Sequence, residues 1–139
     1  MELPATVRRF VQEARVTRLA TIGGDGTPHL VPATFALLEG RIYSVVDEKP
    51  KRTVQLQRLR NIEANTGVAL TVDRYSEDWS ELAWVMIRGV ASVLDGGAEY
   101  ERALDALRTK YLQYQTMALD GRPMVAVEPQ RVNSWGLED

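Results

Sequence analysis

The chain has 139 residues, of which 45% are hydrophobic and 26% charged, so a single domain with one core is expected. A formal net charge of -2 argues against a generally basic nucleic-acid binder, and the lack of cysteine excludes disulfides, thiolate nucleophiles and cysteine-based metal sites. No apolar run approaches the roughly 18 residues of a membrane helix, and the first residues show no signal-peptide pattern. We therefore expect a cytoplasmic protein with no nucleic-acid or membrane partner.

The first part of the chain predicts a helix followed by three strands. Residues 4–15 place apolar side chains at helical spacing, which indicates an amphipathic helix. Residues 17–22 and 29–37 are rich in β-branched and apolar side chains and flank a glycine-rich turn at 23–26, a pattern typical of a β-hairpin. A third short strand is expected at 41–46, so three sequential strands precede the second helix.

The middle of the chain predicts a second helix and two more strands. Apolar residues recur at helical spacing from Pro50 to about Ala64, and proline suits the first turn of a helix. Strand patterns follow at 68–72 and 83–94. The second of these strands is long enough to bend, and Gly89 marks a position where a bulge or barrel corner would fit.

The last part predicts a helix at 99–111 and final strands at 124–127 and 132–135. Sequential strands with tight turns favour antiparallel pairing, and their number favours a closed or partly closed barrel with helices outside. We expect one α+β domain over residues 1–139. The sequence contains neither a dinucleotide-binding G-x-G-x-x-G after a strand nor a P-loop.

A basic cluster is the segment with the most chemical information. The stretch KPKRTVQLQRLRNI at 49–62 carries five cations and no acid. Lys49, Lys51 and Arg52 lie where the predicted helix begins, and cations at that end of a helix dipole cost roughly 0.3–1 kcal/mol each. A bound anion would remove this conflict, because backbone N–H groups, the cations and the Thr53 hydroxyl could converge on one phosphate.

The same cluster has a plainer interpretation. These side chains could form a solvated helix face, with Asp47 and Glu48 as ion-pair partners. Arg58 and Arg60 are expected to be solvated in either case. Nucleic-acid binding is disfavoured because no aromatic residues interleave with the cations.

Four stretches of the sequence together resemble the pyridoxamine-phosphate-oxidase-like split-barrel superfamily: RLATIGGDGTPHLVPATFAL, IYSVVDEKPKRT, QLQRLRNIEANTGVALTVDRY and DWSELAWVMIRGVASVL. The resemblance runs from about Arg18 to Leu94, with a weaker part at Arg131 to Trp135. The elements KPKRT, LRNI and DWS are similar to an actinobacterial subgroup of probable F420-dependent enzymes, close to the flavin/deazaflavin oxidoreductases of the B type.

This resemblance implies a homodimer of six-stranded antiparallel split β-barrels with flanking helices and two cofactor sites at the subunit interface. The implied cofactor is the deazaflavin F420, with FMN as the alternative. The implied cofactor-binding residues are Lys49, Lys51, Arg52 and Thr53 for the phosphate or charged tail, and Pro32, Ala33 and Thr34 for the ring. Pro32 lacks an N–H, which by itself indicates an edge or bulge position.

Three tryptophans and the single histidine are further candidates for the cofactor site. Trp79, in the polar DWS loop, is expected at the pocket rim, whereas Trp84 is expected to serve packing. Trp135 could complete the partner's site, although the family often has a tryptophan pair there. His29 is expected at an edge strand or the surface. A lone histidine cannot form a metal site, so no metal is predicted, and the sequence identifies no catalytic acid or base.

Three functions follow from these observations. The first is an F420-dependent oxidoreductase that transfers hydride between reduced deazaflavin and a small organic substrate, with the cofactor carrying the reaction. The second is a non-catalytic cofactor carrier, or a flavin- or haem-binding sensor, that uses the same groove. The third is an FMN-dependent flavoprotein. The sequence leaves the substrate and the direction of the redox reaction open.

Overall fold

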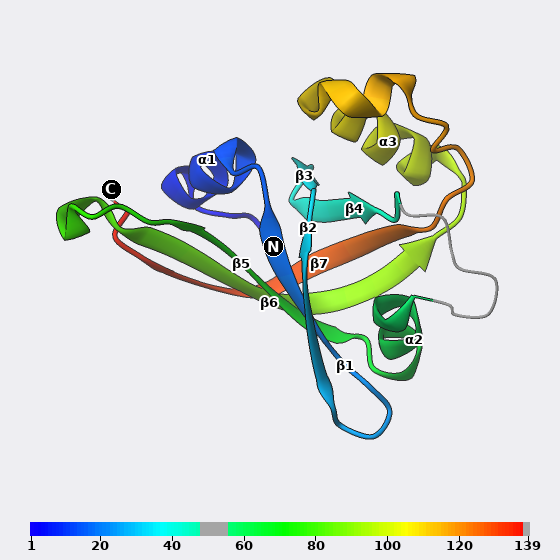
Figure 1. The fold of residues 1–139 in the computed structure, drawn as a ribbon, viewed down its shortest axis with the longest axis horizontal. Helices are drawn as coiled ribbons and strands as arrows, with labels where there is room; N and C mark the ends of the chain where they lie inside the picture. Colours follow the sequence, from blue (N-terminus) through cyan, green and yellow to red (C-terminus); the bar gives the residue numbers. More distant parts are fainter. Residues whose placement is uncertain (48–55, 138–139) are drawn as a thin grey trace.

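The computed structural model describes residues 1–47 and 56–137 of the chain (Figure 1). Three α-helices and two short 3-10 helices surround a curled sheet in this part of the chain. The elements in chain order are α1 (Ala5–Glu13), β1 (Thr17–Ile22), β2 (Pro28–Ala33), β3 (Ala36–Leu38), β4 (Arg41–Val45), α2 (Gln57–Ala64), β5 (Gly67–Arg74), η1 (Trp79–Glu81), β6 (Ala83–Leu94), α3 (Ala98–Lys110), η2 (Leu112–Thr116) and β7 (Met124–Trp135).

The strands form one antiparallel sheet of seven strands in the order β2-β1-β5-β6-β7-β4-β3. Its two edge strands, β2 and β3, follow one another in the chain, so Thr34 and Phe35 connect the two edges of the sheet. Figure 1 shows how strongly the sheet curls to allow this connection. The expected α+β split barrel is therefore confirmed.

The number of strands differs from the six that were expected. The strand predicted over residues 29–37 is divided into β2 and β3, because its first half pairs with β1 and its second half pairs with β4. Phe35 lies at the break and is fully buried. The two strands predicted at 124–127 and 132–135 are one continuous strand, β7, whose pairing with β6 extends over both.

The bend predicted at Gly89 is confirmed. The register between β6 and β7 shifts between Arg88 and Gly89, and Gly89 lies opposite Pro129. A Cβ atom on Gly89 would stand 2.2 Å from the carbonyl oxygen of Glu128. Only glycine therefore allows the two strands to approach this closely.

The second helix begins later than expected. Leu56 has an extended backbone, with ψ 135°, and α2 starts at Gln57. The proposed conflict between the cations and the first turn of this helix is therefore wrong, because its first turn begins after them. The predicted phosphate-binding residues belong to residues 48–55, outside the part of the chain described here: they are Lys49, Lys51, Arg52 and Thr53.

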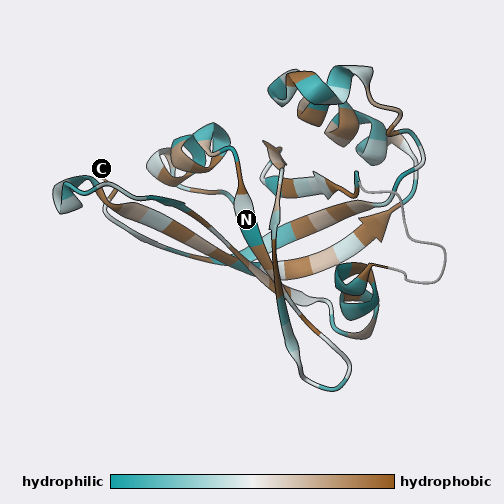
Figure 2. Cartoon of the chain, in the orientation of Figure 1, coloured by the Kyte–Doolittle hydropathy of each residue, from teal (hydrophilic) through white to brown (hydrophobic). Residues whose placement is uncertain are grey.

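Two hydrophobic clusters stabilise the fold. The larger fills the inside of the curled sheet beneath α1 and α2, and includes Leu19, Phe35 and Ile87. The smaller lies between α3 and the outer faces of β3, β4 and β7, and includes Tyr100 and Leu104. Figure 2 shows the matching pattern, with hydrophobic bands along β6 and β7 and mixed hydrophobic and hydrophilic stretches along α3.

A polar link joins α3 to β4. Glu99 Oε2 accepts hydrogen bonds from the Tyr43 hydroxyl at 2.6 Å and from Arg41 Nη1 at 2.9 Å. The Tyr43 hydrogen bond, aided by Arg41, holds the pKa of Glu99 below its ordinary value of 4.5. A carboxyl group with a lowered pKa in the folded state stabilises that state above its unfolded pKa, and this contribution is lost as the pH falls through the folded pKa.

We expect Glu99→Gln to lower the free energy of unfolding by about 1 kcal/mol at pH 7, because the hydrogen bonds lose their charged acceptor. The difference in the free energy of unfolding between Glu99→Gln and the unsubstituted chain should become smaller as the pH falls below about 4.5. Urea unfolding at pH 7 and pH 3 measures both values. Glu101→Gln, an exposed change in the same helical turn, is the control. Equal losses at the two pH values would contradict the prediction.

Candidate functional site

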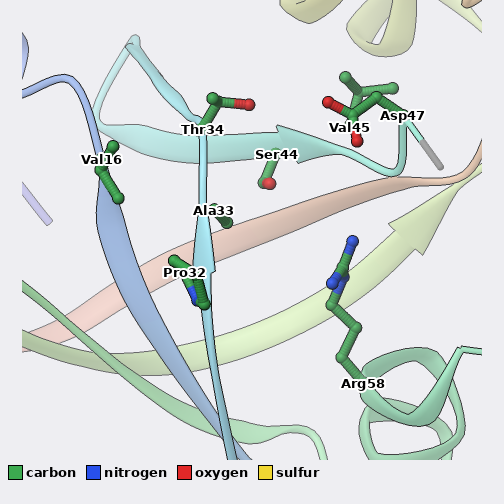
Figure 3. Close-up of a pocket in the computed structure, with 8 residues that line it drawn as sticks. All are labelled: Val16, Pro32, Ala33, Thr34, Ser44, Val45, Asp47 and Arg58. Atoms are coloured by element: carbon green, nitrogen blue, oxygen red, sulfur yellow. The ribbon is translucent and has the colours of Figure 1, made fainter.

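The candidate site is a pocket of about 210 Å³ at the place where the chain crosses from one sheet edge to the other. It lies between the end of β2, the end of β4 and the first turn of α2 (Figure 3). Its lining combines small apolar side chains with two hydroxyls, one carboxylate and one guanidinium: Val16, Pro32, Ala33, Thr34, Ser44, Val45, Asp47 and Arg58.

Pro32, Ala33 and Thr34, which the family resemblance implies for the cofactor ring, form the strand wall of the pocket. Pro32 pairs with Arg18 on an edge strand, so its missing N–H removes no hydrogen bond from the interior of the sheet. The expected edge position of Pro32 is confirmed. Pro32 and Ala33 give this wall a small, apolar surface against which a flat ring could lie.

Arg58 supplies the positive charge of the pocket, although the sequence analysis expected it to be solvated. Its side chain is only 9% exposed and extends from α2 toward Ser44 and Asp47 (Figure 3). Among the described residues, no acid lies within ion-pair distance of its guanidinium. The expectation was wrong because Arg58 shares the buried face of α2 with Asn61 and Ile62 at i+3 and i+4.

A buried hydrogen-bond network holds α2, and with it Arg58, against the sheet. Asn61, which is 2% exposed, donates from Nδ2 to the Thr21 hydroxyl on β1 at 2.9 Å. Gln57 Nε2 donates to Asn61 Oδ1 at 2.7 Å. Buried polar networks of this kind fix a single packing arrangement, because breaking one bond leaves a buried polar group unsatisfied.

A second network connects the strand wall to the end of β4. The Tyr114 hydroxyl donates to Asp47 Oδ2 at 2.6 Å and is hydrogen-bonded to the Thr34 hydroxyl. Burial, with a further contribution from the bond to Asp47, raises the pKa of Tyr114 well above its ordinary value. Arg122 donates to the backbone oxygen of Asp47. The sequence did not indicate roles for Tyr114 or Arg122, and it suggested Asp47 only as an ion-pair partner of the basic cluster.

Of the other predicted site residues, only Trp79 falls in the described part of the chain, and it does not line this pocket. Trp79 lies on η1 and is 69% exposed, and Figure 1 places η1, between β5 and β6, at the end of the sheet opposite α2. Trp84 and Trp135 are register partners on β6 and β7, and both are partly exposed. His29 lies on edge strand β2 opposite Thr21, as expected. Lys49, Lys51, Arg52 and Thr53 fall outside the described residues.

This arrangement suits a ligand with an anionic group and a flat apolar part. A guanidinium binds phosphate or carboxylate oxygens with two parallel hydrogen bonds. The pocket volume of about 210 Å³ is below the roughly 300–1,000 Å³ of typical small-molecule sites, so the described residues alone enclose only part of a cofactor-sized ligand. Across residues 1–47 and 56–137 there is no group of side chains arranged to hold a metal ion, and no helix is long and apolar enough to cross a membrane.

A curled antiparallel sheet whose two edge strands follow one another in the chain defines a split-barrel fold. The chain belongs to the family described as pyridoxamine 5'-phosphate oxidase, whose model matches residues 3–136. This match covers all the sheet strands and all eight lining residues of the pocket.

Similar proteins include a curated enzyme and several solved structures. The chain is 29% identical over 122 residues, 87% of its length and 74% of the relative's, to the 5a,11a-dehydrotetracycline/5a,11a-dehydrooxytetracycline reductase of Streptomyces rimosus subsp. rimosus. The conserved hypothetical protein Rv2991 of Mycobacterium tuberculosis has a TM-score of 0.78 at 23% identity, covering 97% of this chain and 85% of that one. The haem storage protein HutZ of Vibrio cholerae has a TM-score of 0.72 at 15% identity, covering 99% and 96%. These structures share the fold.

Proposed function

We propose that this protein binds the deazaflavin F420 and acts as an oxidoreductase that transfers hydride between the reduced cofactor and a small organic substrate. The observation that carries the proposal is Arg58, a largely buried cation that extends into a pocket whose opposite wall is the apolar Pro32–Ala33 strand end. A cofactor that joins a flat ring to a phosphate is complementary to a site with an apolar surface on one side and a cation on the other. The resemblance in the KPKRT, LRNI and DWS elements favours F420 over FMN.

The charged end of the cofactor is assigned to the side of the pocket where Arg58 lies. Asp47 and Arg58 both line the pocket, and residues 48–55 connect them along the chain. We propose that the cations of this connection, Lys49, Lys51 and Arg52, contact the phosphate or the tail together with Thr53. F420 carries a longer and more negative tail than FMN, which suits several cations better than one.

The flat ring is assigned to the strand wall. When bound, the deazaflavin supplies the hydride chemistry. The chain's own residues hold the ring and exclude water: Pro32 and Ala33 offer an apolar surface without protruding side chains, and Thr34 offers a hydroxyl at the end of the wall. Holding the reactants in a fixed geometry supplies much of the rate enhancement in such reactions, without an acid or base from the protein.

A homodimer would complete the site. The pocket formed by the described residues is smaller than the whole cofactor, and we propose that a second copy of the chain supplies further walls in addition to residues 48–55. Trp79 does not line the pocket of its own chain and is largely exposed, so its predicted place at the rim requires that the partner contributes it. The exposed Trp135 is a second aromatic candidate for the same role.

FMN binding and haem binding are the two alternatives to F420 binding. FMN would use the same cation and the same wall with fewer phosphate contacts. A haem-binding role is disfavoured, because none of the eight pocket-lining residues is a histidine, cysteine, methionine or tyrosine, the side chains that hold haem iron. The similarity to a reductase favours turnover over storage.

Parallel fluorescence titrations of the pure protein with F420 and FMN test the proposal. We expect saturable binding of F420 at micromolar concentration, one per subunit, with FMN binding at least tenfold more weakly. Sedimentation of the same sample should show a dimer. Tighter binding of FMN would establish the flavoprotein alternative, and binding of neither would contradict the proposed function.

A further inference from the structure

We propose that Thr34, oriented by Tyr114 and Asp47, is a specificity-determining residue that accepts a hydrogen bond from an N–H or O–H group of the ligand and rejects an acceptor at that point. This inference rests on the proposed function for the identity of the ligand. Which hydroxyl donates and which accepts follows from the side chains of Thr34, Tyr114 and Asp47 alone.

The phenol of Tyr114 has only one proton to donate. Its oxygen lies 2.6 Å from Asp47 Oδ2, and a carboxylate can only accept hydrogen bonds. A bond to a charged acceptor is stronger than one to a neutral hydroxyl, so the Tyr114 proton is directed to Asp47.

The proton in the hydrogen bond between the Thr34 and Tyr114 hydroxyls must then come from Thr34. The Thr34 hydroxyl is hydrogen-bonded to the same phenol oxygen, and that oxygen has no second proton to give. Thr34 therefore donates to Tyr114. A hydroxyl has one proton and two lone pairs, so Thr34 presents only lone pairs to the pocket that it lines.

This polarity is built into a rigid part of the fold. Tyr114 is 4% exposed, and its ring packs edge-on against Tyr111 with the centroids 5.5 Å apart. The Tyr111 hydroxyl accepts from the backbone N–H of Phe35, next to Thr34, at 3.2 Å, and its single proton lies within reach of the backbone oxygens of Arg15 at 2.8 Å and Phe35 at 3.1 Å. Burial raises the pKa of Tyr114, so the phenol keeps its proton and the polarity does not change with ordinary pH.

The pocket therefore has a donor at one place and an acceptor at another. Arg58 can only donate and Pro32 has no N–H, so Thr34 supplies an acceptor on the strand wall; the Ser44 hydroxyl and the Asp47 carboxylate are the other polar side chains of the lining. The complementary ligand has a ring N–H near Thr34 and an anion near Arg58. The imide N–H of the pyrimidine part of a flavin or deazaflavin is a group of this class.

Binding of a methylated cofactor tests the predicted contact. We compare the cofactor that the unsubstituted protein binds more tightly, F420 or FMN, with its imide N-methyl derivative. The unsubstituted protein should prefer the parent compound by about tenfold, which corresponds to 1.4 kcal/mol for one buried hydrogen bond. Thr34→Val should remove most of this preference, whereas Thr34→Ser should keep it. An unchanged preference in Thr34→Val would overturn the inference.

The direction of the Thr34–Tyr114 bond can be measured without any ligand. Replacing tyrosine by 3-fluorotyrosine makes the phenol more acidic, and fluorine NMR then follows its titration, with Tyr114→Phe identifying the signal. If Thr34 donates, it stabilises the phenolate, so Thr34→Val raises the pKa of residue 114. Asp47→Asn should lower it, because the negative charge is lost.

The two measurements separate the possible failures. A lowered or unchanged pKa in Thr34→Val would show that Thr34 does not donate, and would overturn the inference even if the cofactor binds. Absence of binding of either cofactor to the unsubstituted protein would contradict the proposed function, while a raised pKa in Thr34→Val would still support the acceptor role of Thr34.

Discussion

Replacing Arg58 by glutamine should weaken cofactor binding by about 10- to 100-fold, because a hydrogen bond to a charged group contributes roughly 1.5–3 kcal/mol. The residue is 9% exposed and lines the pocket, where we propose that its guanidinium contacts the bound anion. The cofactor affinity of Arg58→Lys should lie between those of the unsubstituted protein and Arg58→Gln. An ammonium group keeps the charge but cannot form the two parallel hydrogen bonds of a guanidinium. Fluorescence titration measures all three affinities.

Arg60→Gln is the matched control for this change. Arg60 lies on the same helix but is exposed, where its Nη2 donates to the side-chain oxygen of Gln57. It carries the same charge, so a general electrostatic attraction would be weakened equally by both substitutions. A loss confined to Arg58 supports a direct contact with the anion. Equal losses, both abolished by salt, would contradict the assignment of Arg58 to the site.

Gly89→Ala should lower the free energy of unfolding by about 3 kcal/mol, the largest effect on stability that we expect from a single methyl group in this chain. The new Cβ would lie 2.2 Å from the carbonyl oxygen and 2.9 Å from the carbonyl carbon of Glu128. These are backbone atoms of the paired strand β7, which cannot turn away as a side chain can. The two longest strands would have to separate at the bulge.

Urea unfolding of Gly89→Ala and Gly67→Ala measures the effect against a matched control. Gly67 lies on the neighbouring strand β5, opposite Val90, and a Cβ there would meet nothing within 4 Å. Gly67→Ala should therefore change stability by less than about 1 kcal/mol, because the lost freedom of the unfolded chain offsets any small cost in the folded state. Similar losses in both variants would contradict the steric explanation.

Most elements of the fold could be predicted because their signals are local. Strand β6 was expected at residues 83–94 and occupies Ala83–Leu94, since alternating burial leaves a clear pattern in the sequence. The bend at Gly89 was also foreseen. The break at Thr34 and Phe35 was not, because these residues continue the strand pattern and only the choice of partner strand divides it.

Some lining residues of the candidate pocket coincide with residues that the family resemblance implies for cofactor binding, which stays a prediction. Pro32, Ala33 and Thr34 came from the family resemblance and line the pocket. The expectation of a solvated Arg58 was wrong, because Arg58 lies four residues before Ile62 on the buried face of α2. Its i, i+3 relation to Asn61, a polar residue on the apolar face, was a signal that could have revealed it.

The sequence by itself determined the fold class, the edge position of Pro32 and the bulge at Gly89, because each depends on local backbone chemistry or on the alternation of buried side chains. Only the tertiary structure brought Asp47 and Thr34 to Tyr114, which lies 67 and 80 residues away along the chain. It also directed Arg58 into the pocket. Contacts between distant segments depend on how the sheet curls and joins its own edges, and a periodic pattern in one segment does not contain that information.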